Sequence, residues 1–348
     1  MQKSMVCLYR SGKSYWLSLS LPLTCALSSA TGNAWTFVAT TLLVIPVLDA
    51  FAGRGSPMLG AQLERSTDRQ IPCWFALSWA AALGIAAYKS ITAPPLQFIG
   101  LVIACGVLSA TAMAHLHELA HRSAMPWRAF SDLAFTVAGY PHYRYAHELH
   151  HSHLGNPRFG STASIGTSSW YHAGRSYILA LKASLDPSSY KSRTVPRRLV
   201  VHLFVMLLLL MAPLVLGAWQ VAIFMLGYAF VSAFIVETVG YMQHYGFADQ
   251  SQSDAVHSWD VDFWLSNCLL VNNGYHGIHH DEENTPYSQL APTIATLPGG
   301  YFHMLWLSLV PPLWFSVMDR RVRVLSKRRR RQHVGLQDQL RRYPGEVS

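Results

Sequence analysis

Six long apolar segments, joined by polar stretches of very different length, dominate the chain. Each approaches the about 20 apolar residues that an α-helix needs to cross a bilayer. The segments predicted to span a membrane are Tyr15–Ala30, Trp35–Phe51, Ile71–Tyr88, Leu96–Met113, Leu199–Leu216 and Trp219–Gly240. The predicted fold class is therefore all-α: a polytopic membrane protein with about six transmembrane helices.

Three of the connections between these segments are short: Thr31–Ala34, Lys89–Pro95 and Gly217–Ala218. Connections of this length join antiparallel neighbours, so the spans are expected to form three helical hairpins. The alternative for the first segment is a cleaved signal peptide, because Lys3, Arg10 and Lys13 precede it. Its removal would leave the second span without a hairpin partner, which favours the span.

Positive charge is distributed on one side of this arrangement. No Lys or Arg occurs between Leu199 and Gln250, and Lys89 is the only one in the three short turns. The positive-inside rule then puts both termini and the long connections in the cytoplasm. We expect one membrane domain over residues 1–348, in a bacterial inner membrane. Its cytoplasmic catalytic segments would be 114–198 and 241–320, followed by a basic tail at 320–348.

Composition supports the membrane assignment, because only 13% of the residues are charged against about 25% in globular chains. The five cysteines are far apart and form no CxxC pair, which argues against a zinc ribbon or a fused rubredoxin. The net charge of +9 comes largely from the tail, with its run Lys327–Arg331. Nucleic-acid binding is one interpretation of that run, but the preceding apolar stretch Met304–Val317 favours a membrane-surface anchor.

The 17 histidines are concentrated at the predicted cytoplasmic ends of the spans. One HxxxH pair follows the fourth span, and two HxxHH sets follow later. On a helix, residues three and four apart share a face, so each set could aim its imidazoles at a common point. The candidate metal ligands are His117, His121, His147, His150, His151, His244, His276, His279 and His280.

Nine imidazoles are too many for one metal ion and suit two, with four or five ligands each. Imidazole binds Zn, Cu, Fe and Ni, so the ligand type alone does not select the metal. Acidic residues beside the ligands could accept a hydrogen bond from the distal ring N–H and so orient each ring. The candidates for this supporting role are Glu118, Glu148, His257 and Asp281, with Glu282, Asp260 and Asp262 as further choices.

These motifs resemble the integral-membrane fatty-acid desaturase and hydroxylase superfamily, and within it the alkane hydroxylase and xylene monooxygenase branch. The likeness is carried by His117-Glu118-Leu119-Ala120-His121-Arg122, by Tyr241-Met242-Gln243-His244-Tyr245-Gly246 and by the stretch from His257 through Asn267 to His280. It continues into Leu297–Tyr301 and Pro311–Phe315. Two positions depart from the alkane hydroxylases: Ala146 stands where they have Glu, and Tyr275 stands where Arg is common.

The resemblance implies a cytoplasmic di-iron centre held by the nine histidines, with O2 as co-substrate. It implies hydroxylation of an unactivated C–H bond in an apolar substrate: an alkane, a fatty acyl chain or an alkyl-aromatic. The substrate would enter laterally from the lipid. No Rossmann or flavin motif is present, so electrons would come from a rubredoxin- or ferredoxin-like protein with its reductase.

Three other functions compete with hydroxylation. A desaturase or an alkene-forming fatty-acid decarboxylase would use the same scaffold. A metal transporter would place its ionisable ligands near mid-membrane, whereas these histidines lie at span ends. A zinc hydrolase would leave most of nine ligands without a role.

Overall fold

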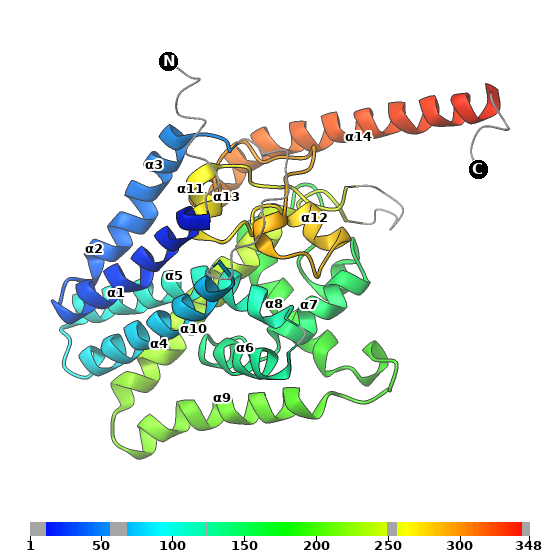
Figure 1. Cartoon of the computed structure of the whole chain (residues 1–348). Helices are drawn as coiled ribbons and strands as arrows, with labels where there is room; N and C mark the ends of the chain where they lie inside the picture. The colour runs from blue at the N-terminus through cyan, green and yellow to red at the C-terminus, as the bar shows by residue number, and fades with distance from the viewer. Residues whose placement is uncertain (1–11, 56–67, 123, 249–255, 343–348) are drawn as a thin grey trace.

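The computed structural model describes residues 12–55, 68–122, 124–248 and 256–342. Regular structure in these ranges is helical, with three isolated β-bridges (Figure 1). The α-helices are α1 (Ser20–Ala30), α2 (Ala34–Ala39), α3 (Ile45–Ala52), α4 (Ile71–Ser90), α5 (Pro95–Ala120), α6 (Met125–Val137), α7 (Tyr143–Ser152), α8 (Ser169–Leu185), α9 (Arg197–Val215), α10 (Trp219–His244), α11 (Trp264–Leu269), α12 (His276–Asp281), α13 (Tyr301–Ser308) and α14 (Pro311–Arg342). The all-α prediction is confirmed.

Among the residues that the structure describes, five helical segments are long and apolar enough to cross a membrane: Ala34–Ala52, Ile71–Ser90, Pro95–Ala120, Arg197–Val215 and Trp219–His244. They match the second to sixth predicted spans, and α5 and α10 run further toward the histidines than expected. The count becomes six if α13 and the first part of α14, which meet at a bend of 116°, form one broken span.

The first predicted span differs from the other five. Its sequence forms a 3₁₀-helix over Gly12–Leu19 and then the 11-residue α1, so it does not meet the length criterion for an α-helical span. A 3₁₀-helix rises about 2.0 Å per residue and an α-helix about 1.5 Å, so the two parts together cover roughly 30 Å. The segment packs against α4 and α2 as the hairpin prediction required.

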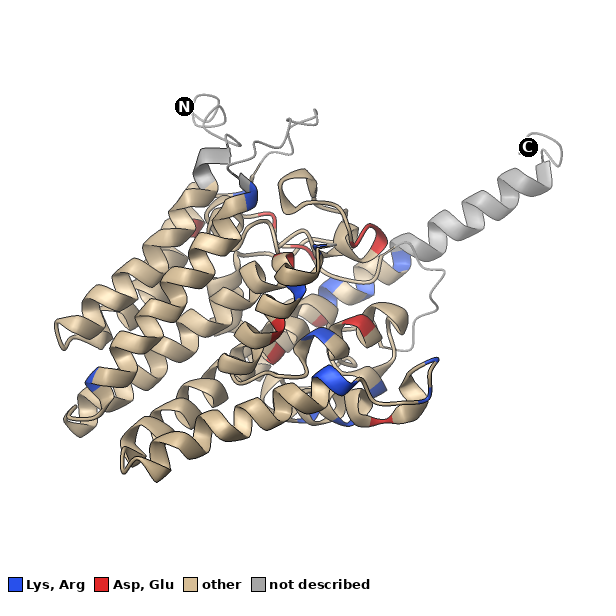
Figure 2. Cartoon of the chain, turned by 60° about the horizontal axis from the view of Figure 1, so that its bottom comes forward, with Lys and Arg blue, Asp and Glu red and all other residues tan. Residues whose placement is uncertain are grey.

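The three predicted hairpins are present: α1 with α2, α4 with α5, and α9 with α10. Gly32 and Gly217 sit in two of the turns with φ of +73° and +75°, a conformation that glycine adopts without strain. Lys and Arg gather at the end of the bundle away from the α4–α5 and α9–α10 turns (Figure 2). Lys3, Arg10 and the Arg328–Arg331 part of the basic run lie outside the residues whose side chains are described.

Helix α5 lies at the centre of the bundle, where it packs against α4, α10, α2 and α6. Its contact with α10 depends on small residues on both helices. A Cβ on Gly106 would lie 2.4 Å from Cβ of Val231, and one on Gly227 would lie 2.8 Å from Cγ1 of Val102. Close approach through glycine is the usual basis of helix association in a bilayer. It holds α5 and α10, which each end at a histidine site, in fixed register.

Helix α9 has a different environment. It is the most apolar candidate span, with mean hydropathy 2.4, yet only 6% of that window is buried within the protein. Exposure of so long an apolar surface to water is unfavourable, whereas contact with lipid is not. Helix α9 therefore presents one side to the bilayer and the other to α6 and α10. The chain is an integral membrane protein.

Candidate metal centre

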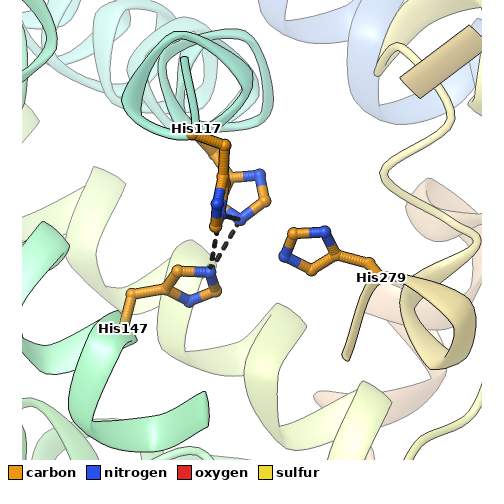
Figure 3. Close-up of side chains that lie close together, drawn as sticks. His117, His147 and His279 are labelled. Carbon is orange, nitrogen blue, oxygen red and sulfur yellow. Dashed lines mark hydrogen bonds between the residues drawn. The ribbon is translucent and has the colours of Figure 1, made fainter. Parts of the chain in front are cut away.

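The first histidine group forms where α5, α7 and α12 meet (Figure 3). Its members are His117, His121, His147 and His279. Nε2 of His117 lies 2.7 Å from Nε2 of His147 and 3.1 Å from Nε2 of His121. One nitrogen from each of the four rings lies within 4.8 Å of the others, so the rings converge on one point.

The second group lies beside the first, where α7 and α12 meet the end of α10. Its members are His150, His244, His276 and His280. Nε2 of His244 is 3.2 Å from Nε2 of His150 and 3.1 Å from Nε2 of His276. The ring centroids of His276 and His279, one from each group, are 5.8 Å apart, so the two groups are immediate neighbours.

The sequence suggested that each HxxHH set could aim its imidazoles at one common point. The structure differs, because each set is divided between the two groups. On α7, His147 goes to the first group and His150 to the second. On α12, His276 and His280 go to the second group and His279 to the first. At about 3.6 residues per turn, positions i+3 and i+4 point about 100° apart around the helix. An i, i+4 pair can therefore share one metal, while i+3 faces its neighbour.

His151 follows the same rule, although it stands outside both groups of four. It is four residues after His147, and the two Nε2 atoms are 2.9 Å apart. Its ring centroid is 4.9 Å from that of His279. Its ring centroid is also 4.6 Å from that of His280, so His151 lies between the two groups. The contact with His147 favours the first group, which would divide the nine predicted histidines five and four.

Both groups fit metal ions. A metal–imidazole bond is about 2.0–2.1 Å, so ligands on opposite sides of one ion are about 4 Å apart, close to the spread of each group. Every donor in the two groups is an imidazole nitrogen. The structure therefore brings together all nine predicted histidines as two adjacent sites that could each hold a metal ion.

Burial keeps these imidazoles neutral. It lowers the pKa of His151 to about 3 and that of His279 to about 2, because the charged form loses its hydration. Burial, followed by repulsion from neighbouring imidazoles, also holds the pKa values of His147 and His276 well below the usual range. A neutral imidazole has a free lone pair on one ring nitrogen, which is the form that binds a metal.

A cavity of about 130 Å³, here called the inner cavity, adjoins the histidines within the bundle. Five histidines line one end of it: His117, His147, His150, His244 and His276. Much of the remaining wall is apolar, with Val107, Val236 and Phe302 among its residues. The buried carboxylate of Glu237 also lines it and accepts a hydrogen bond from the hydroxyl of Tyr140. A small apolar molecule in this space would lie directly against both histidine groups.

A sequence profile described as "Fatty acid desaturase" matches residues 92–297, a range that contains all nine histidines. The chain belongs to the fatty acid desaturase family. The family prediction made from the histidine motifs is confirmed.

Relatives that align with most of this desaturase-family chain are named alkane 1-monooxygenases. Alkane 1-monooxygenase 1 of Pseudomonas aeruginosa is 27% identical over 89% of this chain and 90% of its own length. Alkane 1-monooxygenase 2 of Alcanivorax borkumensis is 26% identical over 83% of this chain and 82% of its own length. Alkane 1-monooxygenase of Acinetobacter baylyi is 24% identical over 80% and 74%, respectively.

Of the residues predicted to support the histidines in this family member, some lie next to a histidine group and others do not. The backbone carbonyl of His257 lies 3.0 Å from Nδ1 of His244 and can accept its N–H, so the Nε2 of His244 is directed at the second group. Glu118 is partly buried in the wall of a small space next to His117. Glu148 instead accepts a hydrogen bond from Arg144, and Asp281 is exposed.

Two acidic residues contribute more than the sequence indicated. The carboxylate of Glu283, which was not predicted, lies 3.6 Å from Nδ1 of His151. Asp260 had been a minor candidate, yet it is fully buried and accepts hydrogen bonds from the backbone N–H groups of Gly277 and Thr293. Burial raises the pKa of Asp260 to about 6, and these N–H donors oppose the rise. Asp260 thus fixes the start of α12, which carries three of the nine histidines.

Neighbouring segments pack closely against α12 and the residues just before it. A Cβ on Gly277 would lie 2.5 Å from Cγ2 of Thr293, and one on Gly274 would lie 2.4 Å from the carbonyl oxygen of Val261. Neither glycine could be replaced without moving a neighbour. The glycine inside the His-Gly-Ile-His-His motif therefore lets the segment 293–297 pack closely over the helix that carries these three histidines.

Asp260→Asn should weaken metal retention. The new amide would present a donor to N–H groups that need an acceptor, and an unsatisfied buried group costs about 1–3 kcal/mol. We expect a lower thermal unfolding midpoint and faster loss of metal to a chelator from protein purified in mild detergent. Asp262→Asn is the matched control, because Asp262 pairs with the half-exposed Arg54, and such pairs contribute about 0–1 kcal/mol. Equal metal retention in the two variants would show that Asp260 does not hold α12.

Proposed function

We propose that this protein is an O2-dependent di-iron membrane monooxygenase that hydroxylates an unactivated C–H bond of an apolar substrate. The substrate class is an alkane, a fatty acyl chain or an alkyl-aromatic. The observation that carries the proposal is the pair of all-histidine groups at the end of a mainly apolar cavity inside a membrane bundle. The names of the full-length relatives support the same activity.

Each histidine has a proposed role as an iron ligand. His117, His121, His147, His151 and His279 would hold one iron, and His150, His244, His276 and His280 the other. When bound, the reduced iron pair supplies the activation of O2 that C–H cleavage requires. The chain's own contribution is to keep nine ring nitrogens neutral and convergent before the metal arrives.

The inner cavity would place the substrate and exclude water. Its apolar walls bind a hydrocarbon without directional contacts, so shape decides which carbon faces the histidines. Exclusion of water matters because it prevents side reactions of a reactive site. Small displacements matter too, since a misplacement of about 1 Å can change rates roughly 100-fold. Desaturation or decarboxylation on this scaffold is therefore the alternative outcome to be distinguished by product analysis.

The proposed setting is a bacterial inner membrane. The chain would form one membrane domain over residues 1–348, with catalytic segments 114–198 and 241–320 and a basic tail at 320–348 on the cytoplasmic side. A rubredoxin- or ferredoxin-like protein with its reductase would supply electrons there. The clustering of Lys and Arg at the histidine-bearing end supports this orientation and would speed association with an acidic donor (Figure 2).

Reporter fusions test the orientation. Fusions at residues 60, 160 and 335 should report the cytoplasm, because they follow the charged connections, and a fusion at residue 92 should report the opposite side. The residue 92 fusion lies in the α4–α5 turn and acts as the internal control. A periplasmic signal at residue 160 would overturn the proposed sidedness.

Elemental analysis tests the metal assignment. Protein purified in mild detergent should contain two iron atoms per chain. His147→Ala and His276→Ala each remove one ligand from a different group. Each substitution should lower the iron content and abolish most of the turnover. His303→Ala is the control, because His303 is exposed and belongs to neither group. A stable zinc-only stoichiometry with full activity would contradict the di-iron proposal.

Labelled oxygen tests the reaction. Membranes supplied with substrate, a rubredoxin- or ferredoxin-like donor and its reductase should place one atom from ¹⁸O₂ in the organic product. Omission of the donor while NADH is kept should stop turnover. An unlabelled alkene as the main product, with the label in water alone, would instead assign the protein to desaturation or decarboxylation.

A further inference from the structure

A second cavity lies between helices at the edge of the bundle. Its volume is about 380 Å³, and it is bounded by α6, α8, α9 and α10. We call it the outer cavity. Leu226 and Phe230 line it and are 55% and 73% exposed, so it opens between α9 and α10 toward the bilayer.

The outer cavity offers a mainly apolar surface to a ligand. Three of its lining side chains carry hydroxyl groups, and each hydroxyl already donates to a backbone carbonyl. Thr136 donates to Asp132, Tyr177 to Gly139 and Tyr228 to Val137, over 2.8, 3.2 and 2.6 Å. No charged residue is among those that line the cavity. A hydrocarbon chain suits such a surface, whereas a polar head group would lose its hydration without compensation.

The two cavities follow one another along the same faces of their shared elements. On α10, Leu226, Phe230 and Ala233 line the outer cavity, and the next positions on that face, Glu237, Gly240 and His244, line the inner one. Steps of three and four residues keep all six on one side of the helix. From Ala233 to Glu237 the rise is only about 6 Å.

Two other segments repeat this order. On α8, Ala173 and Tyr177 line the outer cavity, and Ala180, the next residue on that face, lines the inner one. In the α6–α7 connection, Gly139 lines the outer cavity and Tyr140 lines the inner one. Three separate segments thus pass from one cavity to the other within about one helical turn.

Two tyrosine side chains stand at this transition. The ring centroids of Tyr177, in the outer wall, and Tyr140, in the inner wall, are 4.8 Å apart. Tyr140 is held by its hydrogen bond to Glu237, while the hydroxyl of Tyr177 reaches the Gly139 carbonyl over the longer distance of 3.2 Å. These two rings therefore form part of the partition between the cavities, and Tyr177 is the more weakly held of the two.

Size also links the cavities. Ligand sites in proteins usually measure about 300–1,000 Å³, so the inner cavity at about 130 Å³ is small for one, and the outer cavity would bring the total into that range. We propose that the outer cavity binds the distal part of an extended alkyl chain whose reacting end lies at the histidines, and that Tyr177 turns aside to let the chain pass. The position of the reacting end at the histidines rests on the proposed function, whereas binding of the distal part in the outer cavity does not.

Turnover of a series of n-alkanes tests the tail site. Leu209→Trp would fill the outer cavity from α9, and Leu208→Trp is the matched control, because Leu208 is 50% exposed on the same helix and does not line it. Each excluded methylene should cost roughly fourfold in binding, so Leu209→Trp should raise KM for long chains relative to short ones by that factor per methylene. An unchanged ratio of long-chain to short-chain KM would overturn the tail site while leaving hydroxylation intact.

A binding measurement separates the tail site from catalysis. A long n-alkane carrying a terminal diazirine, photolysed with the full chain in lipid nanodiscs, should label α9 and α10 peptides that line the outer cavity. Excess n-hexadecane should remove this label more effectively than excess n-hexane, and Leu209→Trp should abolish it. Label that survives in Leu209→Trp, or that n-hexadecane does not displace, would mean that the probe reacts from the bilayer. Lipid would then occupy the outer cavity, and the proposal would be wrong. Displaceable label in protein that forms no hydroxylated product would retain the tail site and reject the proposed reaction.

Discussion

The need to bury nine neutral imidazoles at the end of a membrane bundle constrains much of this structure. Two helices, α5 and α10, carry histidines at their ends and are locked to each other through Gly106 and Gly227. The other two helices that carry histidines of the two groups, α7 and α12, are too short to span the membrane and are held by side-chain contacts. Asp260 tethers α12, and Asp132 binds Arg144 at the start of α7. Long helices set the position of the centre, and short tethered helices close it.

The Tyr-Met-Gln-His-Tyr-Gly motif at the end of α10 can be understood in these terms. The hydroxyl of Tyr241 donates to the Thr167 carbonyl, and that of Tyr245 donates to Asp319 on α14. Gly246 has φ of +82°, and a Cβ there would lie 2.5 Å from Cγ2 of Val322. The residues on both sides of His244 therefore fix the helix end against α14 and the 163–167 loop. This support holds in place the one histidine that α10 contributes to the two groups.

Most of the architecture could be predicted from the sequence because bilayer thickness and positive charge act on long segments. Five spans, three hairpins and all nine histidines follow from such local patterns. The division of His147 from His150 could not, because it depends on where neighbouring helices stand around α7. Asp260 was underrated for a similar reason: its partners, Gly277 and Thr293, are brought to it only by folding. The 3₁₀ geometry of Gly12–Leu19 likewise has no clear signal in its composition.

Access and protection make opposite demands on a site of this kind. A substrate that enters from the lipid, as proposed, would have to reach the histidines while water stays away from them. Helix α9 addresses the first demand, because it is scarcely buried and borders a cavity open to the bilayer. The paired rings of Tyr140 and Tyr177 address the second, because they lie 4.8 Å apart where the wall of that cavity meets the wall of the cavity lined by histidines. Rotation of a side chain is much faster than separation of packed helices. A barrier built from side chains can thus open for a hydrocarbon without loosening the helices that hold the nine imidazoles in place.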